Sequence, residues 1–289
     1  MHFQFTIYAG LYLLGAAISV VVATAAWRRR AAASARYLGY MMISIAAWAL
    51  LFAIEVAAVE QADKITFSKL QYIAVNCSVV FLLYFAFSFA GRGHWLTPRR
   101  RGLLWVGPII SMLLAATNDW HALVWPGYEP GPAGTNLLIY HHGPGFWYAI
   151  ILCYLYNAVA SVLLLRQAAQ RGSLGRGQAI SIFLGVLIPW TASLLYAFDV
   201  SPVPGLDMTP IAFSLTGAAL LIGMGRYHLL DLIPVAREML IETMPDGALV
   251  FDAQGRLVDS NPAAREALRL GLSKLPKPLI GQLDRKSVV

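Results

Sequence analysis

Seven apolar runs, each about as long as a bilayer-crossing helix, dominate this sequence. A membrane-spanning helix needs about 20 mostly apolar residues, and these runs stand between charged and turn-forming residues. They cover roughly residues 5–27, 37–59, 69–90, 102–117, 146–165, 178–197 and 209–225. The fourth run is the shortest and contains Pro108. The pattern predicts an all-α integral membrane bundle of seven helices, with the lipid bilayer as its main solvent.

The composition agrees with a membrane protein. Of the 289 residues, 58 % are hydrophobic and only 13 % are charged, about half of the roughly 25 % that is typical of a soluble domain. This excludes an ordinary soluble enzyme. The net charge of +7 does not indicate a nucleic-acid partner, because the basic residues are divided among loops instead of forming one surface. Both cysteines, Cys77 and Cys153, lie inside apolar runs, so no disulfide framework is expected.

Basic residues alternate between successive loops. They occupy the first, third and fifth loops and follow the last run, as Arg28, Arg29, Arg30, Arg36, Arg92, Arg99, Arg100, Arg101, Arg166, Arg171, Arg176, Arg226 and Arg237. The second loop, with Glu60, Asp63 and Lys64, is close to neutral, and the loops 118–145 and 198–208 have neither Lys nor Arg. Lys and Arg are retained on the cytoplasmic side. The alternation therefore predicts an external N-terminus and a cytoplasmic C-terminus.

Aromatic and histidine side chains gather in the fourth loop and at the start of the next run. They are Trp120, His121, Trp125, Tyr128, Tyr140, His141, His142, Trp147 and Tyr148. One interpretation is an interfacial aromatic belt; the other is the roof of a ligand pocket, with Trp120, His121, Trp125, Trp147 and Tyr148 as binding candidates. The histidines could sense pH or bind a metal, but they lack a known ligand spacing. We therefore predict neither a metal site nor a cofactor.

Several polar residues interrupt the apolar runs. Glu55 lies near the outer end of the second run, where an ionisable group is costly enough to be a functional candidate. It either snorkels to the interface or binds a cationic or hydrogen-bond-donating ligand. Asn76 and Asn157 are predicted to form hydrogen bonds between helices. Pro189, followed by Trp190, should kink its helix and could be a moving element in signal transmission.

The pattern changes after the last run. Residues 229–244 have helical apolar spacing, with Asp231 able to cap the helix and Pro234 in its first turn. Short apolar segments near 248–251 and 256–258, separated by turn residues, predict a β-hairpin, and Asn261 should cap the helix that follows. We therefore expect a sensor domain in 1–228, a juxtamembrane signalling helix in 229–244 and a further domain beginning in 245–289.

Two parts of this sequence resemble known protein families. The hairpin and the Asn-Pro-Ala sequence, from Gly247 to Ala264, resemble the opening of an α+β PAS sensor domain. The segment Asp207-Met208-Thr209-Pro210, together with the loop residues Thr117-Asn118, His121 and Trp125, resembles the N-terminal seven-helix sensor region of membrane histidine kinases.

The second resemblance implies a transmembrane signal receptor in the cell membrane of a prokaryote. In that family, a PAS domain, a dimerisation helix with a phosphorylated His and an ATP-binding domain follow the helices; some relatives end in a diguanylate cyclase domain instead. The resemblance implies a homodimer that binds an extracellular or membrane-borne ligand, with Asp207 among the binding candidates, and a response regulator that the kinase region would contact.

The sequence departs from the complete family pattern after the helices. No histidine follows His228, and residues 247–289 contain no Gly-rich ATP-lid segment. The PAS-like part is also shorter than the roughly 100 residues of an ordinary domain. We expect no catalysis within these 289 residues, and we expect the PAS-like domain to be incomplete because the chain is truncated or a fragment.

Two other membrane functions remain as alternatives. A retinal protein needs a Lys in its last helix, and no Lys occurs between Lys69 and Lys274, which excludes a retinal Schiff base there. A small transporter or channel would use Glu55 as an ion site. Ion pathways usually contain several paired ionisable groups, so a single acid makes this the weaker hypothesis.

Overall fold

The structure, a computed structural model, describes residues 2–169, 175–226, 243–251 and 257–272. The chain forms two compact units, Met1–Leu230 and Asp231–Val289. The first unit is mainly helical, and the described part of the second combines two strands with a helix.

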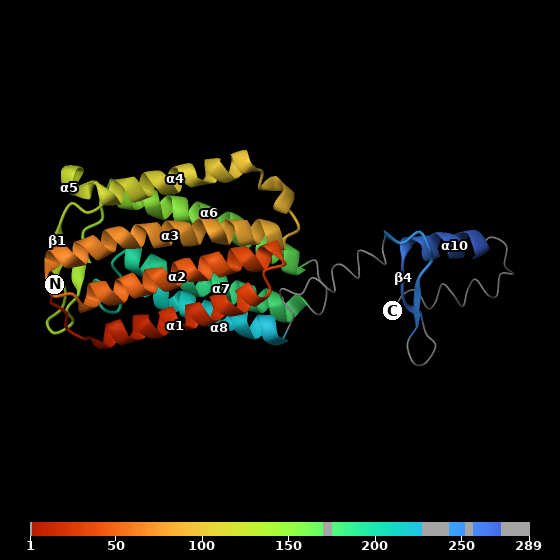
Figure 1. Cartoon of the computed structure of the whole chain (residues 1–289), viewed down its shortest axis with the longest axis horizontal. Helices are drawn as coiled ribbons and strands as arrows, with labels where there is room; N and C mark the ends of the chain where they lie inside the picture. Colours follow the sequence, from red (N-terminus) through yellow and green to blue (C-terminus); the bar gives the residue numbers. More distant parts are fainter. Residues whose placement is uncertain (1, 170–174, 227–242, 252–256, 273–289) are drawn as a thin grey trace. The chain divides into compact units, whose positions relative to one another are not determined.

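Each of the seven apolar runs forms a helix in the first unit (Figure 1). These helices are α1 Ile7–Arg28, α2 Ala33–Ala57, α3 Gln61–Phe89, α4 Pro98–Ala116, α6 Pro144–Ala169, α7 Gly175–Ala197 and α8 Thr209–Arg226. Two short helices, η1 Gly93–Trp95 and α5 Asn118–His121, precede and follow α4. Among the described helices, α1, α2, α3 and α6 are long and apolar enough to cross a membrane. The unit is therefore a membrane-spanning helical bundle.

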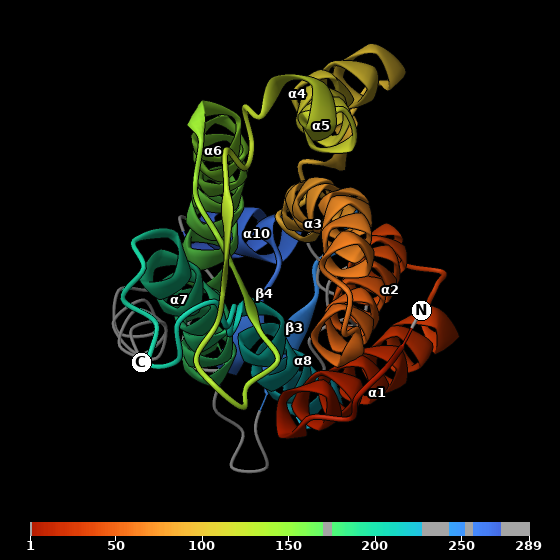
Figure 2. The same ribbon diagram turned by 90° about the vertical axis from the view of Figure 1, so that its left-hand side faces the viewer.

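The helices form a ring (Figure 2). Following the chain, α1, α2 and α3 pack side by side, α3 contacts α6, and α7 and α8 lead back to α1. Helix α4 lies outside this ring, against α3 and α6. Helices α1 and α8 pack closely where the ring closes. A Cβ added to Gly15 of α1 would lie only 2.4 Å from Ser214 Oγ of α8. Small residues permit such close contact between membrane helices.

Local sequence explains where several helices begin. The Thr6 side chain accepts a hydrogen bond from Ala9 N at the start of α1, and Thr97 caps α4 in the same way, with Pro98 in the first position. Such caps satisfy backbone N–H groups that have no partner within the helix. Only three residues, 58–60, connect α2 to α3, so these helices must be antiparallel neighbours.

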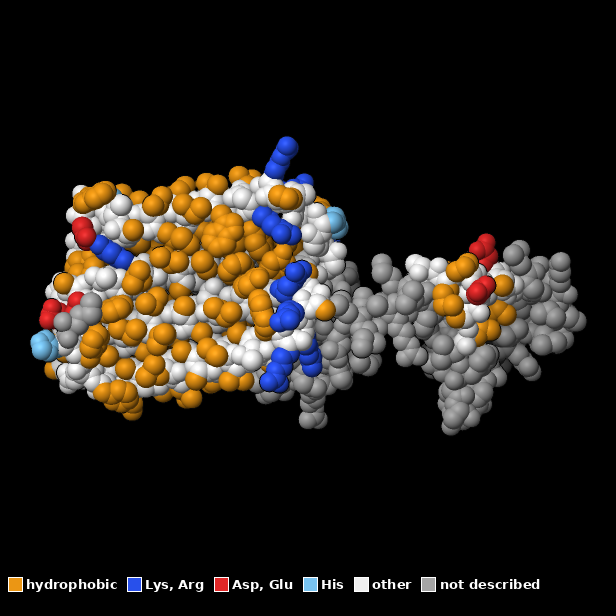
Figure 3. Space-filling model, in the orientation of Figure 1, with side chains coloured by type: hydrophobic (Ala, Val, Ile, Leu, Met, Phe, Trp, Pro, Cys, Tyr) orange, Lys and Arg blue, Asp and Glu red, His pale blue; other side chains and the backbone are white. Residues whose placement is uncertain are grey.

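The two ends of the helical unit differ in charge. On the face shown in Figure 3, hydrophobic side chains cover the long sides of the helices and most Lys and Arg side chains gather at one end. We call this the arginine end; it includes the α1–α2 connection and the start of α4, with Arg29, Arg30 and Arg99. The opposite end, which we call the hairpin end, is formed by α5 and strands β1 and β2.

The hairpin end contains an antiparallel strand pair that the sequence analysis did not predict. Strand β1 (Tyr128–Pro130) pairs with β2 (Leu138–Tyr140), and Tyr128 lies opposite Tyr140. The turn between them includes Gly134 and Asn136, whose φ values are +81° and +53°. Glycine and asparagine adopt this left-handed conformation most easily. The sequence analysis treated residues 118–145 as a loop without strands, because each three-residue strand is too short to leave a periodic pattern.

The second unit contains β3 (Leu249–Phe251), β4 (Leu257–Ser260) and α10 (Pro262–Leu272). The strands are antiparallel. Asn261 Oδ1 accepts hydrogen bonds from Ala264 N (2.9 Å) and Ala248 N (2.8 Å), so this residue caps α10 and binds it to the segment before β3. The predicted hairpin and capped helix are confirmed. The predicted signalling helix, with Asp231 and Pro234, lies almost entirely outside the described residues.

Candidate functional site

A cavity of about 140 Å³ lies inside the ring of helices, between α2, α3, α6, α7 and α8. Aromatic side chains form much of its wall: Trp48, Phe52, Tyr72, Trp125, Tyr140, Phe146, Tyr154, Trp190, Tyr196 and Phe213. Its polar lining includes Glu55 in the last turn of α2, Ser68 and Gln71 in the first half of α3, Asp207 just before α8 and Thr209 at the start of α8. The cavity is therefore aromatic in its walls and acidic towards one end.

Glu55, in the last turn of α2, is the centre of a hydrogen-bond network in this wall. Tyr140 Oη donates to Glu55 Oε1 (2.6 Å), and Gln71 Nε2 donates to Glu55 Oε2 (2.5 Å). Ser68 Oγ donates in turn to Tyr140 Oη (2.6 Å). Only 5 % of Glu55 is exposed. The alternative that Glu55 snorkels to the interface is wrong in this structure, because strand β2 and helix α3 hold its carboxylate inside the protein.

Lys64 connects three elements beside this network. Its Nζ donates to the backbone oxygens of Glu55 (3.1 Å) and Asn136 (2.6 Å), and Asn136 Nδ2 donates to Val56 O (2.7 Å). The sequence analysis placed Lys64 in a loop, and this was wrong: α3 begins at Gln61 and Lys64 is 5 % exposed. The last carbonyls of a helix have no intrahelical donors, and the Lys64 ammonium supplies one to α2.

Asp207 precedes α8 on the other side of the cavity. Its Oδ1 accepts a hydrogen bond from Thr209 N (2.9 Å), and its backbone oxygen accepts one from Tyr12 Oη of α1 (2.6 Å). Burial raises the pKa of the Asp207 carboxyl to about 6, although contacts with Thr209 act in the opposite direction. Burial, followed by the charge of Glu55, also raises the pKa of Tyr140 well above its ordinary value. In both cases the largest cause is burial of the group itself, which disfavours its charged form.

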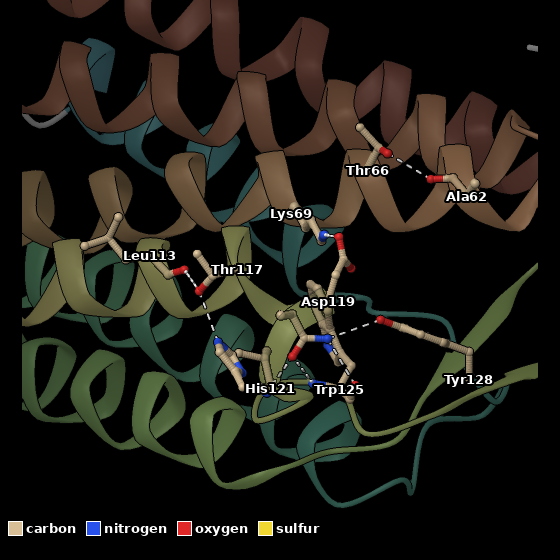
Figure 4. A network of polar contacts seen from close by, with 11 residues as sticks. Ala62, Thr66, Lys69, Leu113, Thr117, Asp119, His121, Trp125 and Tyr128 are labelled. Carbon is tan, nitrogen blue, oxygen red and sulfur yellow. Dashed lines mark hydrogen bonds and ion pairs between the residues drawn. The ribbon is translucent and has the colours of Figure 1, made fainter.

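The loop after α4 folds over this end of the cavity. Asn118 Oδ1 accepts hydrogen bonds from Val124 N (2.8 Å) and Trp125 N (3.1 Å), and Asn118 Nδ2 donates to Trp125 O (3.1 Å). Figure 4 shows Trp125 and Tyr128 within this network. The Trp125 ring then packs against Tyr72 (5.3 Å between centroids) and Tyr140 (5.2 Å). Asn118 thus fixes the backbone that places Trp125 in the cavity wall.

The comparison with protein families decides what this bundle is. A family model described as the N-terminal 7TM region of histidine kinase matches residues 11–234. The chain belongs to this family. The match covers the ring of helices except the first four residues of α1, and it ends before β3, so the PAS-like segment is outside it. A search of curated proteins gave no match. As a member of the 7TM sensor region family, the helical unit has a sensory input role.

The helical unit brings three of the predicted ligand-binding residues to one cavity. Glu55, Trp125 and Asp207 all line it, although they come from α2, the loop after α5 and the loop before α8. Sequence separation alone could not place them together. Asn76, Asn157 and Pro189 also belong to the cavity lining, and Asn76 Nδ2 donates to Ser111 Oγ of α4 (3.3 Å).

The other predicted candidates are not among the described residues that line the cavity. Trp120 is 86 % exposed at the hairpin end, and His121 shares a hydrogen bond with Thr117 Oγ1 (3.0 Å; Figure 4). Trp147 packs against Phe198, and Tyr148 Oη donates to Gly107 O of α4 (3.3 Å). His121, Trp147 and Tyr148 thus contact neighbouring parts of the helical unit.

The histidines of the loop have protein partners. His141 Nε2 lies 3.0 Å from Glu129 Oε1 on the surface, and the His142 ring stacks on Phe146 with 3.7 Å between centroids. Burial lowers the pKa of His142. In the part of the chain that the structure describes, no three His, Cys, Asp or Glu side chains are grouped to hold a metal ion.

Several site residues were missed from the sequence. Lys64, Ser68 and Gln71 all support the Glu55 network, and Trp48 and Phe52 form part of the aromatic wall. A signal was present, because Lys64, Ser68 and Gln71 recur at positions i, i+4 and i+7, which is one face of a helix. A polar stripe on an otherwise apolar membrane helix indicates a polar partner inside the bundle.

Proposed function

We propose that this chain is the signal-receiving part of a two-component sensor histidine kinase, and that its ligand binds in the cavity described above. One observation carries the proposal. Thr209 and Phe213 of α8, and Asp207 just before it, belong to the cavity lining, and α8 is the last helix of the first unit within the described residues. A ligand in the cavity would contact directly the helix that leads to the output.

Helix α8 is well placed to respond. Its Ser214 packs closely against Gly15 of α1, and its Thr216 Oγ1 donates to Gly185 O of α7 (2.9 Å). A ligand shifts an equilibrium between two arrangements only if it binds one of them better. The contacts of the ligand with α8 would supply that difference, and Pro189 of α7 removes a helical hydrogen bond beside the cavity.

The proposed orientation places the hairpin end outside the cell and the arginine end in the cytoplasm. The concentration of Lys and Arg at one end supports it (Figure 3). The chain would then cross the membrane seven times, with its N-terminus outside, and a ligand would reach the cavity from the external side or from the outer leaflet. The second unit would lie in the cytoplasm.

The second unit would receive the signal as the beginning of a PAS domain. Support comes from its hairpin, β3 and β4, and from the helix that Asn261 caps. In this proposal a homodimer transmits the change through residues 229–244 to a kinase region, which phosphorylates a response regulator. The sensory role of the helical unit does not depend on this particular output.

A fusion protein tests the proposal without knowledge of the signal. Residues 1–244 would be joined to the dimerisation and ATP-binding domains of a characterised histidine kinase, and autophosphorylation would be measured in membrane vesicles. We expect Ala149→Phe, which projects into the cavity, to change the rate at least threefold. The control Ile151→Phe lies on the same helix at a position that is 66 % exposed. Equal rates for both variants and the parent would contradict the proposal.

A further inference from the structure

The charges around the cavity are unbalanced. Two carboxyl groups, Glu55 and Asp207, belong to the lining, and the described lining residues include no Lys, Arg or His. Lys64, whose ammonium binds the backbone oxygen of Glu55, supplies one positive charge beside the wall. A buried charge without a partner is costly. The site is therefore suited to accept one further positive charge, and unsuited to an anion.

The polar groups of the lining have unused capacity for hydrogen bonds. Each Glu55 carboxylate oxygen accepts one side-chain hydrogen bond from the described residues, Oε1 from Tyr140 and Oε2 from Gln71, whereas an ionised carboxylate offers about four acceptor sites. The Thr209 hydroxyl is buried and lies near Asp207, but it has no partner at hydrogen-bonding geometry in the described part of the chain. A ligand with N–H donors could satisfy these groups at the hairpin end of the cavity.

The aromatic walls suit the same kind of ligand. Trp48, Tyr72, Trp125 and Trp190 line the cavity, and the faces of Trp and Tyr rings attract cations. The attraction is larger where water is excluded. An apolar or aromatic group attached to the cation would find dispersion contacts with the same rings.

The volume limits the size of the ligand. The cavity measures about 140 Å³, similar to the roughly 150 Å³ of an apolar protein cavity that holds benzene. A second cavity of about 40 Å³ shares Asn157, Pro189, Trp190 and Phe213 with the first. One small ring, or a chain of a few carbons, fits this space together with an ammonium group.

We propose that the cavity binds a small organic cation, a primary to tertiary amine with a short apolar or aromatic part, whose nitrogen lies between Glu55 and Asp207. This inference rests on the proposed function, because it names the ligand class of the same receptor site. The carboxylates and the Thr209 hydroxyl would bind the charged group, and the aromatic walls would enclose the rest.

Three probes of similar size and different charge test the proposal. Benzylamine, benzyl alcohol and benzoate would be titrated at pH 7.5 into the full chain in nanodiscs, with intrinsic tryptophan fluorescence as the signal, since Trp48, Trp125 and Trp190 line the cavity. We expect benzylamine to bind at least tenfold more tightly than benzyl alcohol, and benzoate to bind more weakly than both. Benzyl alcohol binding as tightly as benzylamine, or tighter binding of benzoate, would overturn the proposal.

Two variants and two matched controls locate the cation. Glu55→Gln and Asp207→Asn should each weaken benzylamine binding at least tenfold and leave benzyl alcohol binding within threefold. Glu60→Gln and Asp199→Asn remove exposed acids from the same end of the unit and should change neither. If Glu55→Gln fails to fold, the Asp207→Asn variant and the probe series decide. Equal losses in variants and controls would refute a cavity site.

The outcome can be separated from that of the proposed function. If benzyl alcohol matches benzylamine in binding and also changes phosphorylation in the fusion protein, the receptor stands and the cation inference fails. If benzylamine binds with the expected preference but phosphorylation is the same in the parent fusion and in Ala149→Phe, the cation site stands and the receptor proposal fails.

Discussion

The Tyr140 hydroxyl lies 2.6 Å from Glu55 Oε1, although 85 residues separate them in the chain. Tyr140 ends strand β2 and Glu55 lies in the last turn of α2. The bond joins the hairpin to the ring of helices and orients an acid that lines the cavity. A ligand that moved Glu55 would therefore act on the hairpin as well as on the helices.

Removal of this bond should destabilise the helical unit. Tyr140→Phe deletes the donor to Glu55 and the acceptor for Ser68 Oγ. Hydrogen bonds to charged groups contribute about 1.5–3 kcal/mol, and we expect a loss in that range, measured as a lower thermal unfolding temperature in detergent. Tyr8→Phe is a control, since Tyr8 packs at the edge of a hydrophobic cluster of the same unit. Equal unfolding temperatures for Tyr140→Phe and Tyr8→Phe would contradict the prediction.

Two neighbouring lysines should behave differently. Lys64→Met removes a buried ammonium that binds Glu55 O and Asn136 O, and we expect a loss of about 2–3 kcal/mol with faster proteolysis of the hairpin turn, because charge-assisted bonds are strong. Lys69→Met breaks only the partly exposed pair with Asp119 (2.6 Å), which should contribute less than about 1 kcal/mol. A larger loss of stability in Lys69→Met than in Lys64→Met, measured by denaturation or by proteolysis, would contradict the prediction that the buried lysine contributes more.

The stability of the unit should depend on the ionisation of Asp207. Burial raises its pKa to about 6, whereas an unfolded chain has an Asp pKa of about 3.9. The folded state therefore favours the protonated acid. Below about pH 4, Asp207 is protonated in both the folded and the unfolded state, and the free energy of unfolding is at its highest with respect to this group. As the pH rises through 6, the free energy of unfolding falls by roughly 3 kcal/mol.

Asp207→Asn isolates this titration because the amide oxygen can still accept from Thr209 N. We expect the variant to match the parent near pH 4 and to unfold at a higher temperature above pH 6. The titratable groups that face Asp207 are Glu55 and the hydroxyls of Tyr12, Tyr154 and Tyr196. They are present in both the parent and the variant, so their titration does not contribute to the difference. A temperature difference that stays constant from pH 4 to 7 would disprove the assignment.

Labelling of single cysteines should establish the orientation in the membrane. In a background without Cys77 and Cys153, Ala133→Cys in the exposed hairpin turn should react with a membrane-impermeant maleimide on intact cells. Arg99→Cys, exposed at the arginine end, should react only after permeabilisation. The opposite result would invert the proposed topology, and labelling of both sites on intact cells would refute the crossing between them.

The helices and their approximate ends could be predicted from the sequence, because each one depends on a local excess of apolar residues. The family resemblance was equally local, and the match over residues 11–234 confirms it. The hairpin β3–β4 and the cap at Asn261 were also predictable, since turn residues and a capping side chain act within a few positions.

The assembly of the cavity was a different matter. The sequence indicated that Glu55 is important, but it left open whether the acid faces the interface or a ligand, and it assigned Lys64 to a loop. The fold buries Glu55 in the cavity wall and places Lys64 in α3, because Tyr140, Gln71 and Asn136 come from separate elements that approach these two residues only when the ring closes. Apolar runs determine helices through local contacts, whereas partners of a buried charge depend on distant contacts that no local pattern encodes.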